Sequence, residues 1–184
     1  MHRLIVPGID DSDADHWQSH WQSEWDTAAS RIAPASWSEP DLEDWLDALD
    51  RAVDANDYRR MVVVAHSLGC LAVAEWLIRR RPGTEAVIGV FLVAPPDSAG
   101  ANFPTAARGF APTSTMPLKP PGVVVSSDND QYCTSAAASA LAARWRLNHI
   151  VTHGLGHINS ASNLGTWQDG RDLFTVFTAG LGHQ

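Results

Sequence analysis

One run of β-branched residues that ends abruptly in a serine constrains the fold of this chain more than any other feature. Residues Met61–Ala65 are all apolar, a pattern typical of a parallel strand that is buried on both faces. Ser67 follows almost directly, and the apolar run Leu68–Ile78 predicts a helix immediately behind it. The order strand, serine, helix is typical of a nucleophile elbow, the tight turn that exposes a reactive serine.

Small residues flank this serine at the positions where the backbone of an elbow is crowded. The usual pattern is G-x-S-x-G, in which small side chains keep Cβ atoms out of the turn. Here the outer positions are Ala65 and Gly69, so alanine replaces the first glycine. A buried strand followed by an ordinary N-cap serine would look similar, so the elbow hypothesis depends on the later part of the chain.

Length, charge and cysteine content limit the classes of function. The 184 residues suffice for a hydrophobic core, and we expect a single domain over residues 1–184. A formal net charge of −8 argues against binding to nucleic acid or to a membrane surface. The chain has no long apolar run and no signal-peptide pattern, so we expect a cytoplasmic protein. Cys70 and Cys133 are expected to be reduced, buried thiols.

Predicted strands alternate with predicted helices along the chain. Further strands are expected at Leu4–Val6, within Ser30–Trp37, at Ala86–Ala94, at Val123–Ser126 and at His149–Thr152. Further helices are expected at Asp15–Asp26, where three tryptophans at a spacing of four form a core-facing stripe, and at Asp41–Asp54, Ser135–Trp145 and Gln168–Leu181. The alternation predicts a three-layer, doubly wound α/β fold with a mainly parallel sheet and active residues at the carboxyl ends of its strands.

The segment Pro95–Pro121 interrupts this alternation. It holds seven of the eleven prolines, which argues against a helical cap over the sheet and predicts an open site. Phe103 and Phe110 lie within it and can supply a shallow apolar wall for substrate, or can simply anchor their own loop. An open, shallow site favours short acyl groups, because the binding energy of a long chain comes from burying its methylenes.

A catalytic serine needs a base and an acid that orients the base, and candidates for both come after later strands. Asp128 and Asp130 come after the expected strand at 123–126, and Asp97 comes after the strand that ends at residue 94. His153 and His157 lie in a glycine-rich loop after the strand at 149–152. The chain order serine, aspartate, histidine is that of α/β-hydrolases.

Three further residues with reactive side chains are weaker candidates for a catalytic part. His153 has little loop with which to reach back to the serine. His66 is expected to point away from the nucleophile and to pack beside the sheet, because successive side chains of an extended chain alternate in direction. Cys70, one helical turn behind the serine, is expected to be a small buried hydrophobe.

Four motifs in order resemble one known family, the small, lidless α/β-hydrolases grouped with retinoblastoma-binding protein nine and its bacterial YdeN-like relatives. They are Val6-Pro7-Gly8 with His16-Trp17, His66-Ser67-Leu68-Gly69, Ser127-x-x-Asp130-x-x-Cys133 and Gly156-His157-Ile158-Asn159. The resemblance covers nearly the whole chain. It implies a minimal α/β-hydrolase fold without a cap domain and a triad of Ser67, Asp130 and His157.

One property of the family is not expected to carry over. The retinoblastoma-binding signature Leu-x-Cys-x-Glu is absent, because the matching stretch Leu68–Ala72 ends in alanine. No retinoblastoma-type partner is therefore expected.

We predict from these features a serine hydrolase that acts on small carboxylic esters through an acyl-enzyme, without a metal or organic cofactor. The backbone N–H groups of Leu68 and Ile9 are expected to bind the oxyanion. The alternative is a binding or adaptor protein that keeps the hydrolase fold with a vestigial or rarely used triad. A nucleotide-binding function is disfavoured because no glycine-rich phosphate loop comes after Val6.

Overall fold

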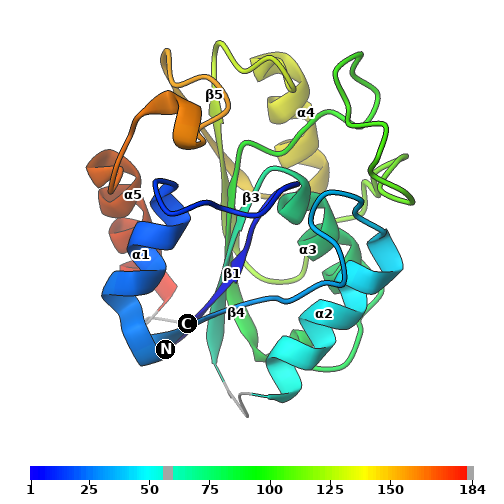
Figure 1. Ribbon diagram of the computed structural model, residues 1–184, viewed down its shortest axis with the longest axis vertical. Helices are drawn as coiled ribbons and strands as arrows, with labels where there is room; N and C mark the ends of the chain where they lie inside the picture. Colours follow the sequence, from blue (N-terminus) through cyan, green and yellow to red (C-terminus); the bar gives the residue numbers. More distant parts are fainter. Residues whose placement is uncertain (56–59, 182–184) are drawn as a thin grey trace.

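A parallel six-stranded sheet forms the centre of the molecule in the computed structural model, which describes residues 1–55 and 60–181 (Figure 1). The strand order is β2-β1-β3-β4-β5-β6, and every neighbouring pair is parallel. The strands are β1 (His2–Val6), β2 (Ala29–Arg31), β3 (Met61–His66), β4 (Val87–Val93), β5 (Gly122–Ser127) and β6 (Asn148–Thr152). This sheet is the parallel one that the alternating pattern predicts.

Helices cover both faces of the sheet, as the predicted three-layer arrangement requires (Figure 1). The helices are α1 (Trp17–Trp25), α2 (Leu42–Asp54), α3 (Leu68–Ile78), α4 (Ser135–Trp145) and α5 (Gln168–Gly180). Helices α2, α3 and α4 pack on one face, and α1 and α5 pack on the other. None of the helices in the described part of the chain is both long and apolar enough to cross a bilayer.

The central strand β3 shows why its sequence is apolar throughout. Val63 belongs to the core beneath α2 and α3, whereas the neighbouring Val64 belongs to the core beneath α1 and α5. Successive residues of a strand point to opposite faces, so a strand covered on both faces needs apolar residues at every position.

The tryptophan stripe of α1 faces the core, as its spacing predicts. Trp17 and Trp21 are almost completely buried, and Trp25 is partly buried. The helix begins two residues later than predicted, because His16 is extended and caps it, its Nδ1 accepting from the backbone N–H of Gln18.

Strand β2 is short, as predicted, but it begins one residue before the predicted range. It spans Ala29–Arg31 only, so it begins before the expected range Ser30–Trp37 and ends well inside it. The strand lies at the edge of the sheet and pairs with β1 over three residues. Pro34 lacks a backbone N–H and cannot continue the pairing.

Candidate active site

Ser67 occupies a strained turn between β3 and α3. Its φ of 53° and ψ of −126° fall outside the regions that side-chain-bearing residues favour, as at a nucleophile elbow. A Cβ on Gly69 would collide with the carbonyl oxygens of Val6 and Pro7 at the end of β1. Gly69 therefore allows α3 to pack closely against the end of β1. The local sequence does not indicate that β1 is the neighbour.

The three side chains predicted as a triad lie in one hydrogen-bonded chain. His157 Nε2 is 2.8 Å from Ser67 Oγ, and His157 Nδ1 is 2.8 Å from Asp130 Oδ2. The carboxylate accepts from Nδ1–H, which leaves Nε2 as the acceptor for the serine hydroxyl. The Asp130 side chain is 1% exposed and the His157 side chain is 9% exposed, so the hydrogen bond between them is shielded from bulk water.

The rival acids lie elsewhere. Asp128 contacts His153, whose Nδ1 is 2.7 Å from Asp128 Oδ2, and both side chains are substantially exposed. The backbone N–H of Gly154, together with His153, lowers the pKa of Asp128. Asp97 accepts a backbone hydrogen bond from Ala99 within its own turn. Neither Asp128 nor Asp97 makes the hydrogen bond to His157, because Asp130 occupies its Nδ1.

Two polar side chains hold the loop that carries His157. Ser127 Oγ accepts from the N–H of Leu155 at 2.9 Å, and Asn129 Oδ1 accepts from the N–H of Gly156 at 2.7 Å. Ser127 and Asn129 belong to the segment that supplies the acid, so one turn positions the acid and the loop that carries the histidine. Ser127 opens one of the four family motifs, whereas Asn129 has only its place beside the candidate acids as a signal in the sequence.

The expectation for His66 is wrong in one respect. Its ring is buried beside the sheet as predicted, but it does not leave the site: Nε2 lies 2.9 Å from the backbone oxygen of His157. The two rings are 5.0 Å apart. Burial holds the pKa of His66 well below its usual range, so this imidazole stays neutral and is a weaker base than an exposed histidine.

The two thiols are buried, as predicted. Cys70 Sγ lies 3.3 Å from the carbonyl oxygen of Val93 within the core. Burial raises the pKa of Cys70 above its usual range and that of Cys133 to about 12. Neither cysteine therefore forms the thiolate that a second nucleophile would need.

A cleft of about 370 Å³ opens beside Ser67. Its walls include Gly8 and Ile9 from the loop after β1, Pro104 from the segment between β4 and β5, and the ring of Tyr132. The centre of the Tyr132 ring also lies 4.5 Å from that of the His157 ring. Tyr132 lies two residues after the acid, and no sequence pattern indicated it.

The two phenylalanines predicted as a substrate wall do not line this cleft. Phe110 is 2% exposed, with its ring 5.5 Å from that of Trp45, and Phe103 packs against the same core. The prediction of an apolar wall from these residues is therefore wrong, and anchoring of their own loop is what they do. Burial favours the core over the cleft because aromatic rings gain most where their whole surface leaves water.

The backbone N–H groups of Ile9, which lines the cleft, and of Leu68, next to Ser67, have no acceptor among the described residues. Leu68 is the first residue of α3, so its N–H has no intrahelical acceptor. In the loop after β1, Asp10 N–H donates to Trp37 and Asp11 N–H donates to Gly8. Within residues 1–55 and 60–181, the N–H groups of Ile9 and Leu68 donate to no other atom.

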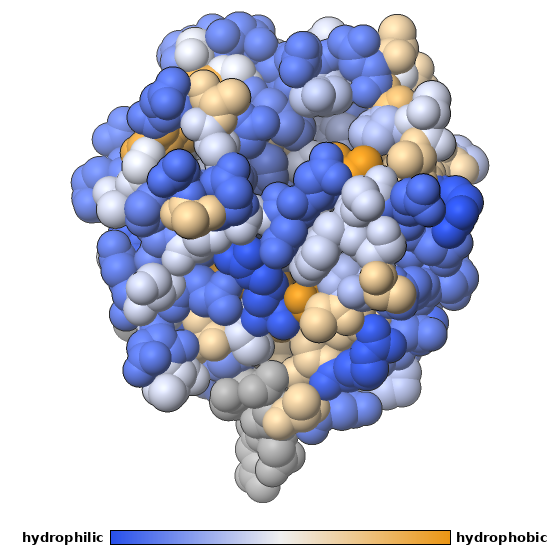
Figure 2. All heavy atoms as spheres, in the orientation of Figure 1, coloured by the Kyte–Doolittle hydropathy of each residue, from blue (hydrophilic) through white to orange (hydrophobic). Residues whose placement is uncertain are grey.

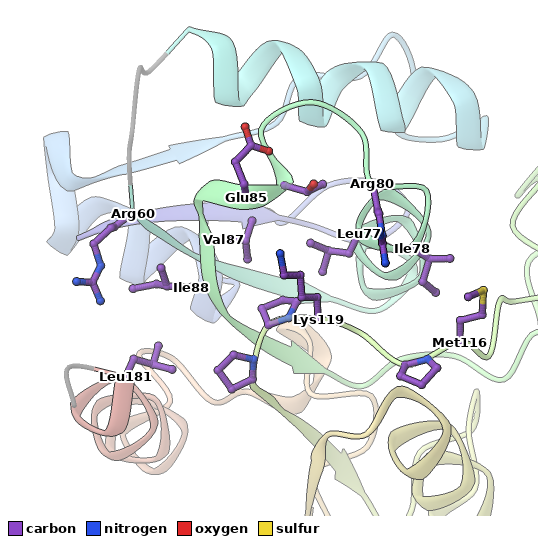
Figure 3. A pocket seen from close by; sticks show the side chains of 14 residues that line it. Arg60, Leu77, Ile78, Arg80, Glu85, Val87, Ile88, Met116, Lys119 and Leu181 are labelled. Atoms are coloured by element: carbon purple, nitrogen blue, oxygen red, sulfur yellow. The ribbon is translucent and has the colours of Figure 1, made fainter. Parts of the chain in front are cut away.

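A second hollow of about 450 Å³ lies at the opposite end of the sheet (Figure 3). Its lining includes Arg60 just before β3, Val87 at the start of β4 and Pro121 just before β5. These are the amino ends of the strands, about 20 Å from their carboxyl ends for strands of about six residues at about 3.3 Å each. The hollow is therefore separate from the cleft at Ser67.

The molecular face seen in Figure 2 is mainly hydrophilic, in keeping with the acidic composition.

The fold and the site together define a class of protein. A parallel sheet with a serine elbow after β3, an acid after β5 and a histidine after β6 is an α/β-hydrolase fold, here with no α-helix in the described segment between β4 and β5. The chain belongs to the serine hydrolase family, whose family model matches residues 3–176.

Solved structures agree with this assignment. A protein described as a putative YdeN-like hydrolase from Pectobacterium atrosepticum is 28% identical, with a TM-score of 0.84 over 98% of this chain and 91% of that one. The ydeN gene product of B. subtilis is 19% identical, with a TM-score of 0.78 over 97% and 100% of the two chains. Est1E from Butyrivibrio proteoclasticus, solved with ferulic acid bound, shares the fold at 13% identity, with a TM-score of 0.73 over 96% and 89%. No curated protein matches the chain.

Proposed function

We propose that this serine hydrolase is a carboxylesterase for small esters, with Ser67 as nucleophile, His157 as base and Asp130 as orienting acid. The observation that carries the proposal is the continuous hydrogen-bonded chain from Ser67 Oγ through His157 to Asp130 beside a cleft. A serine is a weak nucleophile unless a base takes its proton, and this geometry supplies that base.

Each atom of the chain has a defined part in the reaction. His157 Nε2 takes the proton as Ser67 Oγ attacks the ester carbonyl, and it then protonates the departing alcohol. The acyl group stays on Ser67 until a water, deprotonated by the same nitrogen, attacks its carbonyl carbon. The bond to Ser67 Oγ then breaks, Nε2 returns the proton to Oγ, and the carboxylic acid leaves. Asp130 keeps the Nδ1–H tautomer and stabilises the imidazolium that forms in between.

The oxyanion of the tetrahedral intermediate is expected to accept from the N–H groups of Leu68 and Ile9. Both stand beside the nucleophile, at the start of α3 and in the loop after β1, and neither has an acceptor among the described residues. Preorganised donors of this kind stabilise the charge that develops in the transition state.

Substrate size is expected to depend on the shape of the cleft. No cap covers its 370 Å³ in the described part of the chain, and the segment between β4 and β5 contributes Pro96 and Pro104 instead of a helix. Acetate and butyrate esters should therefore be preferred. In a series of p-nitrophenyl esters below their aggregation limits, kcat/KM should stop rising by octanoate. A rise that continues to longer acyl chains would contradict the preference for short acyl groups.

Covalent labelling tests the nucleophile directly. A fluorophosphonate probe should form one adduct, on Ser67, and the Ser67→Ala protein should form none at this site. Wild-type protein that is folded by circular dichroism but remains unlabelled would favour a binding or adaptor function with an inactive triad.

A further inference from the structure

The turn that carries His157 is strained at the next residue. Ile158 has a φ of 50°, in the left-handed region that β-branched residues rarely adopt. Such a conformation persists only where the surroundings impose it, and it is common at functional sites. The Ile158 side chain is completely buried in the core beneath α1 and α5.

Two side-chain N–H groups hold the carbonyls on this turn. Trp17 Nε1 donates to the backbone oxygen of Ile158 at 2.9 Å, and His66 Nε2 lies 2.9 Å from the backbone oxygen of His157. A carbonyl oxygen only accepts, so His66 carries its proton on Nε2. Consecutive carbonyls are thus bound by donors from α1 and from the end of β3.

Both donors are themselves rigidly placed. Trp17 is 1% exposed and His66 is 4% exposed. Their rings lie 6.2 Å apart, and Trp17 also packs 5.1 Å from Trp167. The backbone of His66 leads directly into Ser67, so one residue connects the nucleophile elbow with the turn that presents the base.

We propose that Trp17 and His66 are positioning residues, whose N–H groups hold the strained turn at Ile158 and so aim the imidazole of His157 at Ser67. The inference rests on the proposed esterase function. It assigns a role to the tryptophan at the start of α1, which lies 141 positions from its acceptor along the chain. Misplacement of a catalytic group by about 1 Å can cost about 100-fold in rate.

The test compares two tryptophans on the same helix. Trp17→Phe keeps an aromatic ring in the core but removes the donor to Ile158. Trp21→Phe is the matched control, because Trp21 is equally buried and its Nε1 donates to the oxygen of Thr166, away from the base. With p-nitrophenyl acetate, Trp17→Phe should lower kcat about 10- to 100-fold at nearly unchanged KM, and Trp21→Phe should change kcat less than about threefold.

The outcomes separate this inference from the proposed function. A wild-type protein that fails to react with the fluorophosphonate probe would contradict the esterase proposal itself. A reactive wild type with equal kcat losses in the two phenylalanine variants, matching their losses in melting temperature, would overturn the positioning role alone.

A second pair of variants decides the matter if Trp17→Phe does not fold. His66→Gln retains an N–H donor at a similar reach, whereas His66→Leu has none. The glutamine variant should label at Ser67 about tenfold faster than the leucine variant, measured on folded protein. Equal labelling rates would overturn the role of His66.

Discussion

Two aspartate–histidine pairs in the molecule make the same kind of hydrogen bond, but one pair is buried and the other is exposed. Asp130 contacts His157 and Asp128 contacts His153, each through Nδ1 and Oδ2, at 2.8 and 2.7 Å. The acids are two residues apart and the histidines four, on the same two loops. The side chains of the first pair are 1% and 9% exposed, and those of the second pair are 43% and 84% exposed.

The proposed function assigns catalysis to only one of these pairs, because a hydrogen bond alone does not make a catalytic dyad. His157 has a serine at its other nitrogen, 2.8 Å away, whereas His153 faces solvent. Burial also matters, because a carboxylate shielded from water interacts more strongly with the imidazolium that forms in the reaction. The outer pair instead ties the start of the loop to the end of β5, where Asp128 also accepts from Gly154 N–H.

The largest effect should separate the two histidines. His157→Ala should lower ester hydrolysis by at least about 10³-fold, as should Ser67→Ala, because triad members act as a unit. His153→Ala should stay within about threefold of wild type. Rates of purified, folded variants with p-nitrophenyl acetate check this. Comparable losses at both histidines would mean that the exposed pair belongs to the site.

The acids should differ in the same way. Asp130→Asn should reduce kcat by about 10³-fold or more, because the amide no longer holds the tautomer in which His157 accepts the serine proton. Asp128→Asn and Asp97→Asn should each cost less than about tenfold in the same assay. A greater loss at Asp97 than at Asp130 would move the acid to the end of β4.

Asn129 lies between the two acids and sharpens the comparison at a smaller scale. Asn129→Ala removes the acceptor for Gly156 N–H and should lower kcat about tenfold through a looser loop. Asn129 Oδ1 also accepts from Ser127 Oγ, a contact within its own turn. Asn102→Ala is the control, because it removes an exposed asparagine that donates to the carbonyl of Gln131 rather than to the loop that carries His157. Equal rates in the two variants would show that the loop keeps its place without this contact.

Buried histidines should also make stability depend on pH. Burial lowers the pKa of His16 from 6.5 to about 4, and that of His66 well below 6.5. The folded state then binds fewer protons than the unfolded state, so the free energy of unfolding falls as the pH falls from 6.5 towards 4. Each such histidine contributes about 1.4 kcal/mol per pH unit in that window.

Urea titrations at pH 7, 6 and 5 measure this slope. His16→Gln should reduce the slope by about the contribution of one histidine. A wild-type stability that is constant from pH 7 to 5 would contradict the low pKa of the buried rings.

Local sequence determined the elements that depend on local physics. The apolar run of β3, the serine and the helix behind it were predictable because a doubly covered strand and a crowded turn each admit few residue types. The tryptophan stripe of α1 was predictable because helical periodicity places every fourth residue on one face.

Tertiary structure decided which of several equivalent side chains meet. The sequence offered two histidines to three aspartates, and only the register of β5 beside β6 places Asp130 opposite His157. The tertiary structure also places Phe110 against Trp45 rather than in the cleft, and it places Trp17 Nε1 against the backbone oxygen of Ile158. Contacts between residues this far apart in the chain depend on the packing of whole elements, which no local pattern of residues encodes.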